Sequence, residues 1–189
     1  MSPLIDLIGS AKGYGWGSFV NLPPSFDSIS TTTISGSGVT SITFSSIPQT
    51  YSHLQIRYWT IAATANNSYP RLRFNGDTAS NYNSDRLVSD GTSVTTYSGT
   101  TTSQIESSGF TWTAGDVDPE VGIIDIADYA NANKYKVAIS YGGADQNAGG
   151  GVWLASGVWR NTAAITSITI ISPSFGVPAK FALYGIKGA

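Results

Sequence analysis

His53 is the only histidine of the chain, so any serine–histidine–aspartate triad would have to be built on it. It stands next to Leu54 at the start of an alternating stretch, and no Gly-x-Ser-x-Gly turn supplies a nucleophile. The chain contains no cysteine, which excludes disulfide bonds, thiolate chemistry and a zinc site of histidine and cysteine. We expect His53 to be a residue at the start or rim of a strand.

Paired carboxylates are what a glycosidase needs, one on each side of the sugar bond that it cleaves. The only glutamates, Glu106 and Glu120, fall in segments that we predict as loops, and Asp125 and Asp128 lie at the end of a buried-looking strand. We expect solvated acids rather than a catalytic pair, with Asp125 and Asp128 capping the turn at 129–134. The sequence predicts a protein that is not an enzyme.

Two further patterns suggest ligands. Asp116, Asp118 and Glu120 alternate like the oxygen donors of a calcium loop, but the glycine and the twelve-residue spacing of such loops are missing. Calcium is therefore an alternative to a polar turn, and no other cofactor is expected. Several tryptophans could form a platform for sugar rings, although in small β proteins such side chains are usually core or subunit contacts. These tryptophans are Trp59, Trp112, Trp153 and Trp159.

The charge balance excludes several partners. Of the 189 residues only 12% are charged, and the net charge is −2. The lysines and arginines are scattered, so no basic patch for nucleic acid is expected. No apolar run approaches the roughly 18 residues of a membrane span, so membrane insertion is not expected either.

Short alternating runs separated by turn signals, with no helical periodicity over ten residues, predict an all-β protein. We expect an antiparallel, jelly-roll-like β-sandwich at 26–189, preceded by an extended N-terminal arm at 1–25. Segments 98–118 and 142–151 are rich in serine, threonine or glycine and are predicted to be largely loop. The predicted strands are 26–34, 39–44, 53–62, 71–74, 86–88, 93–97, 110–113, 121–126, 135–141, 152–159, 167–172 and 180–186.

The N-terminal arm carries large apolar side chains on a glycine-rich background. Glycine alternates with larger residues at 13–18, a pattern that suits an extended segment with anchoring rings. Asp6 interrupts the first apolar run, so a signal peptide is not expected. An ordinary first strand with a loose lead-in is the alternative to a docking arm. The residues expected to dock are Leu4, Ile5, Leu7, Ile8, Tyr14, Trp16 and Phe19.

Several stretches resemble a family of small β-rich virion structural proteins of tailed bacteriophages, of the kind found in environmental phages and cyanophages. They read SITFSSIP at 41–48, YSHLQIR at 51–57, IDIADYANANK at 124–134, GVWRNTAAITSITI at 157–170 and FALYGIK at 181–187. These are scaffold motifs, so the resemblance implies a fold and a setting rather than catalytic residues. It implies a jelly-roll-like domain on the surface of the phage particle.

Within that setting we expect a capsid decoration, or cement, protein on the outer head surface. Its arm would attach it to the major capsid protein, and a homotrimer would hide exposed sheet edges. The alternative is a tail or fibre module that recognises a glycan or protein of the host surface through loops 63–69, 97–109 and 142–151. The candidate loop contacts are Asn66, Asn67, Tyr69, Tyr97, Asp145, Gln146 and Asn147.

Overall fold

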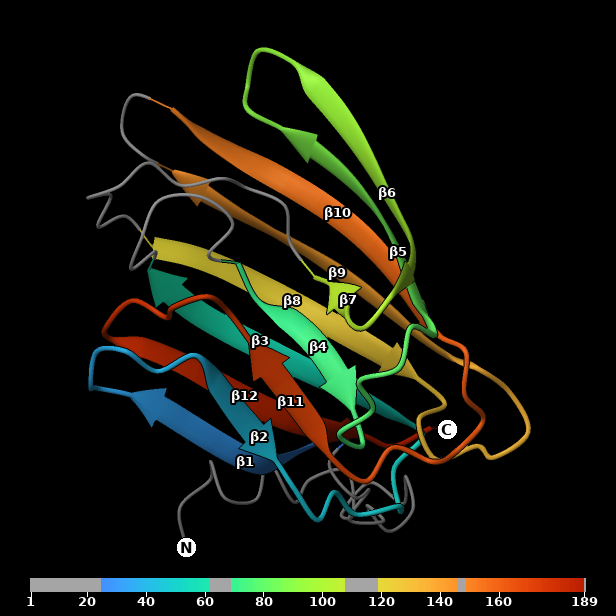
Figure 1. Ribbon diagram of the computed structural model, residues 1–189. Helices are drawn as coiled ribbons and strands as arrows, with labels where there is room; N and C mark the ends of the chain where they lie inside the picture. The colour runs from blue at the N-terminus through green and yellow to red at the C-terminus, as the bar shows by residue number, and fades with distance from the viewer. Residues whose placement is uncertain (1–24, 62–68, 108–118, 146–148, 189) are drawn as a thin grey trace, which may run out of the picture.

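The computed structural model describes residues 25–61, 69–107, 119–145 and 149–188 of the chain, and these residues form strands, turns and loops without a helix (Figure 1). The strands are β1 (Phe26–Ile34), β2 (Ser41–Phe44), β3 (His53–Ile61), β4 (Arg71–Phe74), β5 (Tyr82–Ser89), β6 (Val94–Thr102), β7 (Ile105–Glu106), β8 (Pro119–Ala127), β9 (Lys136–Asp145), β10 (Gly150–Trp159), β11 (Ile168–Ile171) and β12 (Ala179–Ile186).

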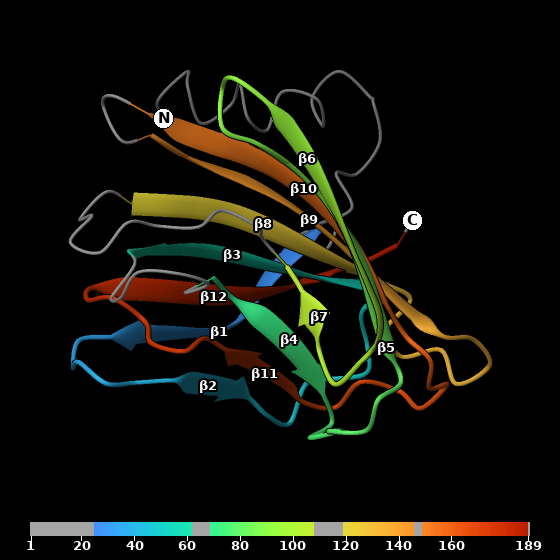
Figure 2. The ribbon, with the colours of Figure 1, turned by 45° about the horizontal axis from the view of Figure 1, so that its top comes forward.

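The strands form two sheets, and every pair of neighbouring strands is antiparallel. The large sheet has the order β1-β12-β3-β8-β9-β10-β5-β6, and the small sheet has the order β2-β11-β4-β7. The small sheet lies over the part of the large sheet that holds β12, β3 and β8 (Figures 1 and 2). The β10-β5-β6 part of the large sheet extends past it.

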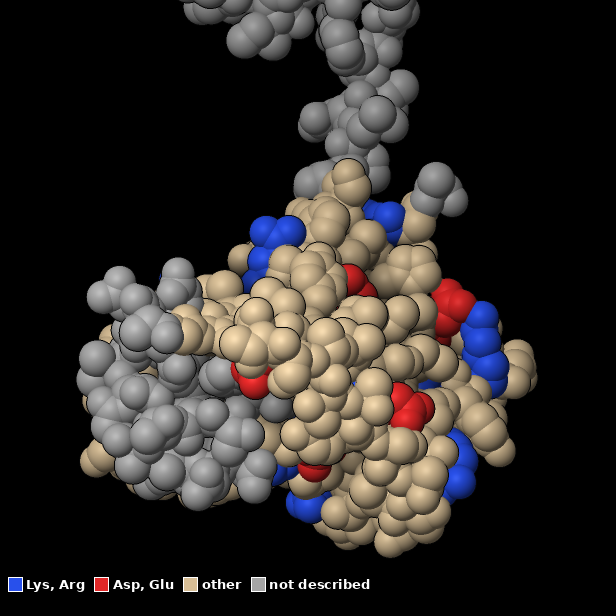
Figure 3. Space-filling view, turned by 90° about the horizontal axis from the view of Figure 1, so that it is seen from above, with Lys and Arg blue, Asp and Glu red and all other residues tan. Residues whose placement is uncertain are grey.

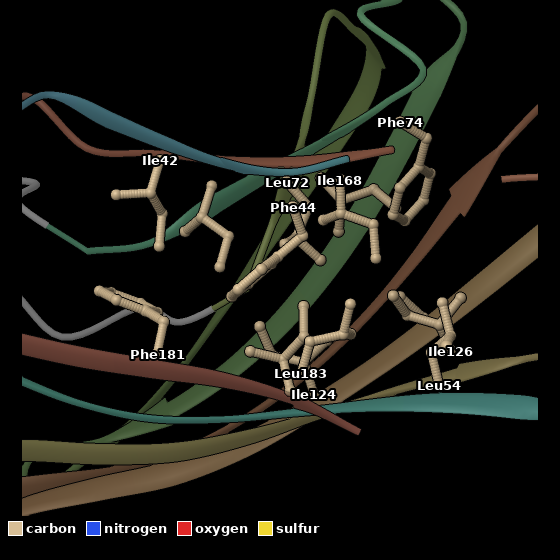
Figure 4. Close-up of a cluster of buried hydrophobic side chains, with 14 of the residues drawn as sticks. Ile42, Phe44, Leu54, Leu72, Phe74, Ile124, Ile126, Ile168, Phe181 and Leu183 are labelled. Atoms are coloured by element: carbon tan, nitrogen blue, oxygen red, sulfur yellow. The ribbon is translucent and has the colours of Figure 1, made fainter. Parts of the chain in front are cut away.

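The hydrophobic core fills the space between the two sheets (Figure 4). Alternation along each strand sends every second side chain into this space, which is about 10 Å deep in packed sheets. The small sheet contributes Ile42, Phe44, Leu72, Phe74 and Ile168, all at most 9% exposed. The large sheet faces them with residues that are completely buried: Leu54, Ile56, Ile124, Ile126, Phe181 and Leu183.

A tight turn after β4 is hydrogen-bonded to the segment that precedes β11. Asn75 and Gly76 both have positive φ, 52° and 67°, a conformation that Asn-Gly pairs adopt readily in tight turns. The side-chain oxygen of Asn75 accepts hydrogen bonds from the backbone N–H groups of Thr166 and Ser167 at 2.8 and 3.1 Å. Its amide donates to the carbonyl oxygen of Ala164 at 2.8 Å, so one turn residue fixes the approach to β11.

The all-β antiparallel sandwich predicted from the sequence is confirmed; the jelly-roll detail stays a prediction. Strands β1 and β4 begin and end where the pattern placed them, and β3 differs by one residue. The N-terminal arm lies outside the described residues except for Ser25, whose carbonyl oxygen accepts a hydrogen bond from the N–H of Lys187.

The two loop predictions were wrong where strands extend into them, while 108–118, with the predicted strand at 110–113, and 146–148 lie outside the described residues. Strand β6 continues to Thr102 and β7 follows, while β9 continues to Asp145 and β10 starts at Gly150. Glycine is needed inside β9 because a Cβ at Gly142 would run into the ring of Trp153 and the carbonyl of Val121. Glycine here marks close packing within a sheet, and the sequence pattern of such a segment looks like that of a loop.

Candidate interaction face

Strand β9 has the opposite polarity from an ordinary amphipathic strand. The side chains that it turns toward the small sheet are Lys136, Ala138 and Ser140, which are 0%, 2% and 3% exposed. The side chains on its other side include Ile139 and Tyr141, which are 47% and 46% exposed. A strand normally buries its large apolar residues, so this inversion points to a function for the solvent-facing side.

Neighbouring strands continue this apolar surface, which we call the outer face. In one row across the sheet, Ile123, Tyr141, Leu154 and Leu87 are successive cross-strand partners in β8, β9, β10 and β5. Directly paired side chains on one face of a sheet contact each other, so the row forms a continuous apolar band. The apolar members of the outer face are Val121, Ile123, Val137, Ile139, Tyr141, Val152, Leu154 and Leu87.

The polar side chains beside the outer face bind one another. The Arg57 guanidinium donates to the side-chain oxygen of Gln55 at 2.8 Å, and the Gln55 amide donates to Asp125 at 2.7 Å. Arg57 also lies 5.8 Å from the ring centres of Phe26 and Tyr184. The molecule seen from above in Figure 3 is mostly uncharged, with scattered lysine, arginine and acidic side chains.

A shallow hollow of about 660 Å³ lies in the outer face. Its floor is the backbone around Gly122, Gly142 and Gly143, where the sheet presents no side chain, and its walls include Val121 and Val152. Gly122 has the same packing constraint as Gly142, because a Cβ there would strike the ring of Tyr58. Gly122 and Gly142 therefore make room for aromatic rings on the inner side, and Gly143 is the outward position of β9 that has no side chain.

Polar groups inside the sandwich are held by specific partners. The Lys136 ammonium donates to the carbonyl oxygens of Asn131, Lys134 and Thr162 at 2.6, 2.7 and 2.9 Å. Burial, together with the nearby charge of Lys134, lowers the pKa of Lys136. The residue closes the β8–β9 connection against the segment after β10, which is a structural role.

A second polar cluster corrects two sequence predictions. Tyr69, predicted as a loop contact, is only 4% exposed, and its hydroxyl donates to Glu106. Glu106 lies in β7 rather than a loop and pairs with Arg71 and Arg86 at 3.3 and 3.4 Å. Burial raises the pKa of Tyr69, and the hydrogen bond to Glu106 adds to this. Tyr97 lies in β6 and is 45% exposed, with the Arg86 guanidinium 4.8 Å from its ring centre.

The other predicted acids also have structural contacts. Glu120, predicted as a solvated loop acid, is completely buried in β8 and accepts a hydrogen bond from the Tyr58 hydroxyl at 2.9 Å. Asp125 does not cap the turn at 129–134, because it accepts from Gln55. Asp128 binds Lys134 within that turn, and this pairing holds the pKa of Asp128 below its ordinary value.

His53 occupies the first position of β3, as predicted, with its side chain 43% exposed. Its Nδ1 accepts a hydrogen bond from the backbone N–H of Asp128 at 3.1 Å. The four-tryptophan platform does not form, because Trp153 and Trp159 are 3% and 1% exposed on the inner side of β10. Trp112 lies outside the described residues.

Other predicted contacts fall on residues without a described placement. Asp145 is the last residue of β9 rather than part of a loop. The following predicted residues lie outside the described ranges: Leu4, Ile5, Leu7, Ile8, Tyr14, Trp16, Phe19, Asn66, Asn67, Asp116, Asp118, Gln146 and Asn147.

Within the described ranges, no three histidine or acidic side chains gather as a metal site would require. None of the described segments is a helix long and apolar enough to span a membrane. No family model matches the chain, and no curated protein sequence matches it. The outer face was not predicted from the sequence. The alternation in β9 is visible there, but it does not show which side of the strand is covered by the small sheet and which faces solvent.

Proposed function

We propose that this chain is a non-enzymatic structural protein of a tailed-bacteriophage virion, and specifically a decoration protein on the outer surface of the head. The observation that carries the structural role is the apolar outer face of β8, β9, β10 and β5. The phage setting rests on the sequence resemblance alone.

The outer face supports a role in assembly. Soluble monomers rarely expose contiguous apolar patches larger than a few hundred Å² unless these bind a partner. Here seven apolar side chains between 41% and 61% exposed stand on four adjacent strands: Leu87, Val121, Val137, Ile139, Tyr141, Val152 and Leu154. A rigid sheet with such a face suits a protein that packs against other proteins.

The contacts of the titratable residues support a non-enzymatic role. Glu120 and Glu106 bind tyrosines, and Asp77 accepts hydrogen bonds from the backbone of Ala79 and the side chains of Asn81 and Trp159. Each of these carboxylates secures a connection between elements of the sandwich. A general acid or base would instead face a substrate cleft.

Immunogold electron microscopy of the phage particles, with antibody against residues 26–189, tests the proposal. We expect label over the head surface. Label confined to the tail would replace decoration by the receptor-binding alternative, in which the protein binds a host glycan or surface protein. Intact phage particles without label on either head or tail would overturn the virion role.

Attachment through the arm has its own test. We expect a chain lacking residues 2–20 to keep the circular dichroism spectrum of the β domain. It should no longer bind to phage heads that were prepared without this protein. Full-length protein added to the same heads is the matched control. Decoration by the shortened chain at the level of the full chain would show that the arm is not the attachment device.

A further inference from the structure

We infer that the outer face is the contact between two copies of this chain, packed sheet against sheet about a twofold axis. The second copy would lie with its own outer face on the first, and Tyr141 of each copy would enter the hollow at Gly143 of the other. This inference goes beyond the decoration role and does not depend on the phage setting.

The area of the face fits a stable pair. With the adjacent strands β3 and β6, the outer face spans six strands, which are about 29 Å wide at about 4.8 Å per strand, and seven residues extend about 23 Å along them. The flat area is therefore roughly 650 Å², and the protruding side chains make the accessible surface larger than this. A standard interface buries approximately 800 Å² per partner.

The charge distribution fits an identical partner. The outward positions of β9 and β10 carry no charged residue from Val137 to Gly143 and from Val152 to Val158. Two copies therefore bring no like charges together at the centre of the contact. The nearest charged group on β8, Asp125, already accepts a hydrogen bond from Gln55, so covering this side leaves it with a partner.

The register of the sheet identifies the axis. Tyr58, Gly122, Gly142, Trp153 and Val88 are successive cross-strand partners in one row. We place the twofold axis between the large sheets of the two copies, along this row and perpendicular to the strands. The axis then puts the residue just before the row in one copy over the residue just after the row in the other copy. This places the second copy of each strand over the first, as in aligned sheet packing.

That axis makes the surface complementary to itself. It exchanges Tyr141 with Gly143, so each ring faces the hollow where the other copy has no side chain. It also places Leu154 over Val152, and Arg57 over Trp59, a cation above an aromatic ring. In a twofold contact each such pair occurs twice, because residue i contacts j and j contacts i.

Sedimentation equilibrium of the full chain tests the inference. Between about 1 and 100 µM, the range in which moderate interfaces dissociate, we expect reversible association toward about 40 kDa, twice the 19.8 kDa of one chain. Leu154→Lys should raise the dimer dissociation constant at least about a hundredfold, because it buries an unpaired charge at the centre of the contact. Ser41→Lys adds the same charge to the exposed side of the small sheet and should leave the constant unchanged.

A second variant separates a specific contact from general stickiness. Gly143→Leu fills the hollow and adds apolar surface, so we expect it to weaken the dimer about tenfold or more, while unspecific apolar association would become stronger. Thermal unfolding at low concentration checks that each variant folds. A chain that stays monomeric at about 100 µM, a trimer of about 59 kDa that Leu154→Lys leaves intact, or tighter association of Gly143→Leu would each overturn the inference.

Discussion

Side chains alternate between the two sides of the large sheet along every strand, but β9 places its large apolar residues on the opposite side from β3 and β12. On β3 and β12 the large apolar residues, such as Leu54 and Phe181, face the small sheet and are completely buried. On β9 the side facing the small sheet holds Lys136 and Ser140, and Ile139 faces solvent. The difference follows from position, because β9 lies near the margin of the small sheet, where backbone carbonyl oxygens of Asn131, Thr162 and Ser107 meet its inward polar groups.

The buried polar groups of β9 have hydrogen-bond partners, whereas the buried indole nitrogen of Trp153 in β10 has none among the described residues. Lys136 binds three carbonyl oxygens, and the Ser140 hydroxyl donates to the carbonyl of Ser107. A buried polar group that makes its hydrogen bonds costs little, whereas an unpaired one costs about 1–3 kcal/mol. The inner side of β9 is therefore held by specific hydrogen bonds, whereas its outer side is apolar and exposed in the part of the chain that the structure describes.

The largest expected effect comes from the inner side of β10. Trp159 packs against Tyr82 and Phe74, with ring centres 6.2 and 5.6 Å away, and its indole N–H donates to Asp77 at 2.7 Å. Trp159→Ala should lower the free energy of unfolding by about 3–5 kcal/mol, because it removes a buried ring and leaves a cavity. Urea denaturation measures this loss.

The matched control lies on the same strand. Leu154→Ala removes an apolar side chain from the outer side, where it is 52% exposed, and should cost less than about 1 kcal/mol in dilute protein. Equal losses for the two variants would contradict the contrast between the sides of β10.

Lys136 gives the next largest effect. Lys136→Met keeps the length of the side chain but leaves the carbonyl oxygens of Asn131, Lys134 and Thr162 without their donor. We expect a loss of about 2–3 kcal/mol in the free energy of unfolding. Val137→Met, one residue along on the exposed side, should be nearly neutral. If the Lys136→Met protein is as stable as the parent, these three hydrogen bonds make no net contribution to the free energy of unfolding.

A smaller effect depends on pH. Partial burial favours a raised pKa for Asp77, but hydrogen bonds from Asn81, the N–H of Ala79 and Trp159 outweigh it and hold the pKa below its ordinary value. Such a carboxyl stabilises the fold above its unfolded pKa of about 3.9, and that stability is lost as pH falls through the lower folded pKa. Asp77→Asn should therefore reduce the stability at pH 7 by about 1 kcal/mol.

The same variant should also flatten the decline in stability below pH 4, because it removes one group that takes up a proton on unfolding. Denaturation midpoints of both proteins at pH 7 and pH 3 give the comparison. An identical decline in the two proteins would show that Asp77 is not among the groups responsible.

Much of the fold could be predicted from the sequence, and the candidate face could not. The Ser/Thr-rich run at 26–34 and the alternating run at 71–74 are each followed by turn residues, so these strands were placed correctly. The glycines inside β9 made its last residues look like a loop. Gly142 is required by the ring of Trp153, which lies on another strand, so the local sequence does not reveal the reason for the glycine. The side that β9 buries depends on its place in the large sheet, near the margin of the small sheet. That place is set by long-range strand pairing, which alternation does not encode.

Tyr69 and Glu120 show the same limit for individual side chains. Both stand among polar residues and were predicted as exposed loop residues, yet both are buried with partners distant in sequence, Glu106 and Tyr58. Local composition reports how polar a segment is. It does not report that a carboxylate and a tyrosine hydroxyl can be buried together when they satisfy each other's hydrogen bonds.

The smallest effect is expected on the outer face. Ile139→Thr keeps the β-branched shape and removes apolar surface at a position that is 47% exposed. In dilute protein it should change the free energy of unfolding by no more than about 0.5 kcal/mol, and it should reduce binding of an apolar dye. If the outer face joins two copies, the same substitution should cost more as the concentration rises, because association stabilises only the parent's folded state. A large loss already at the lowest concentration would mean that Ile139 is covered within a single chain, and the contrast between the two sides would fail at its centre.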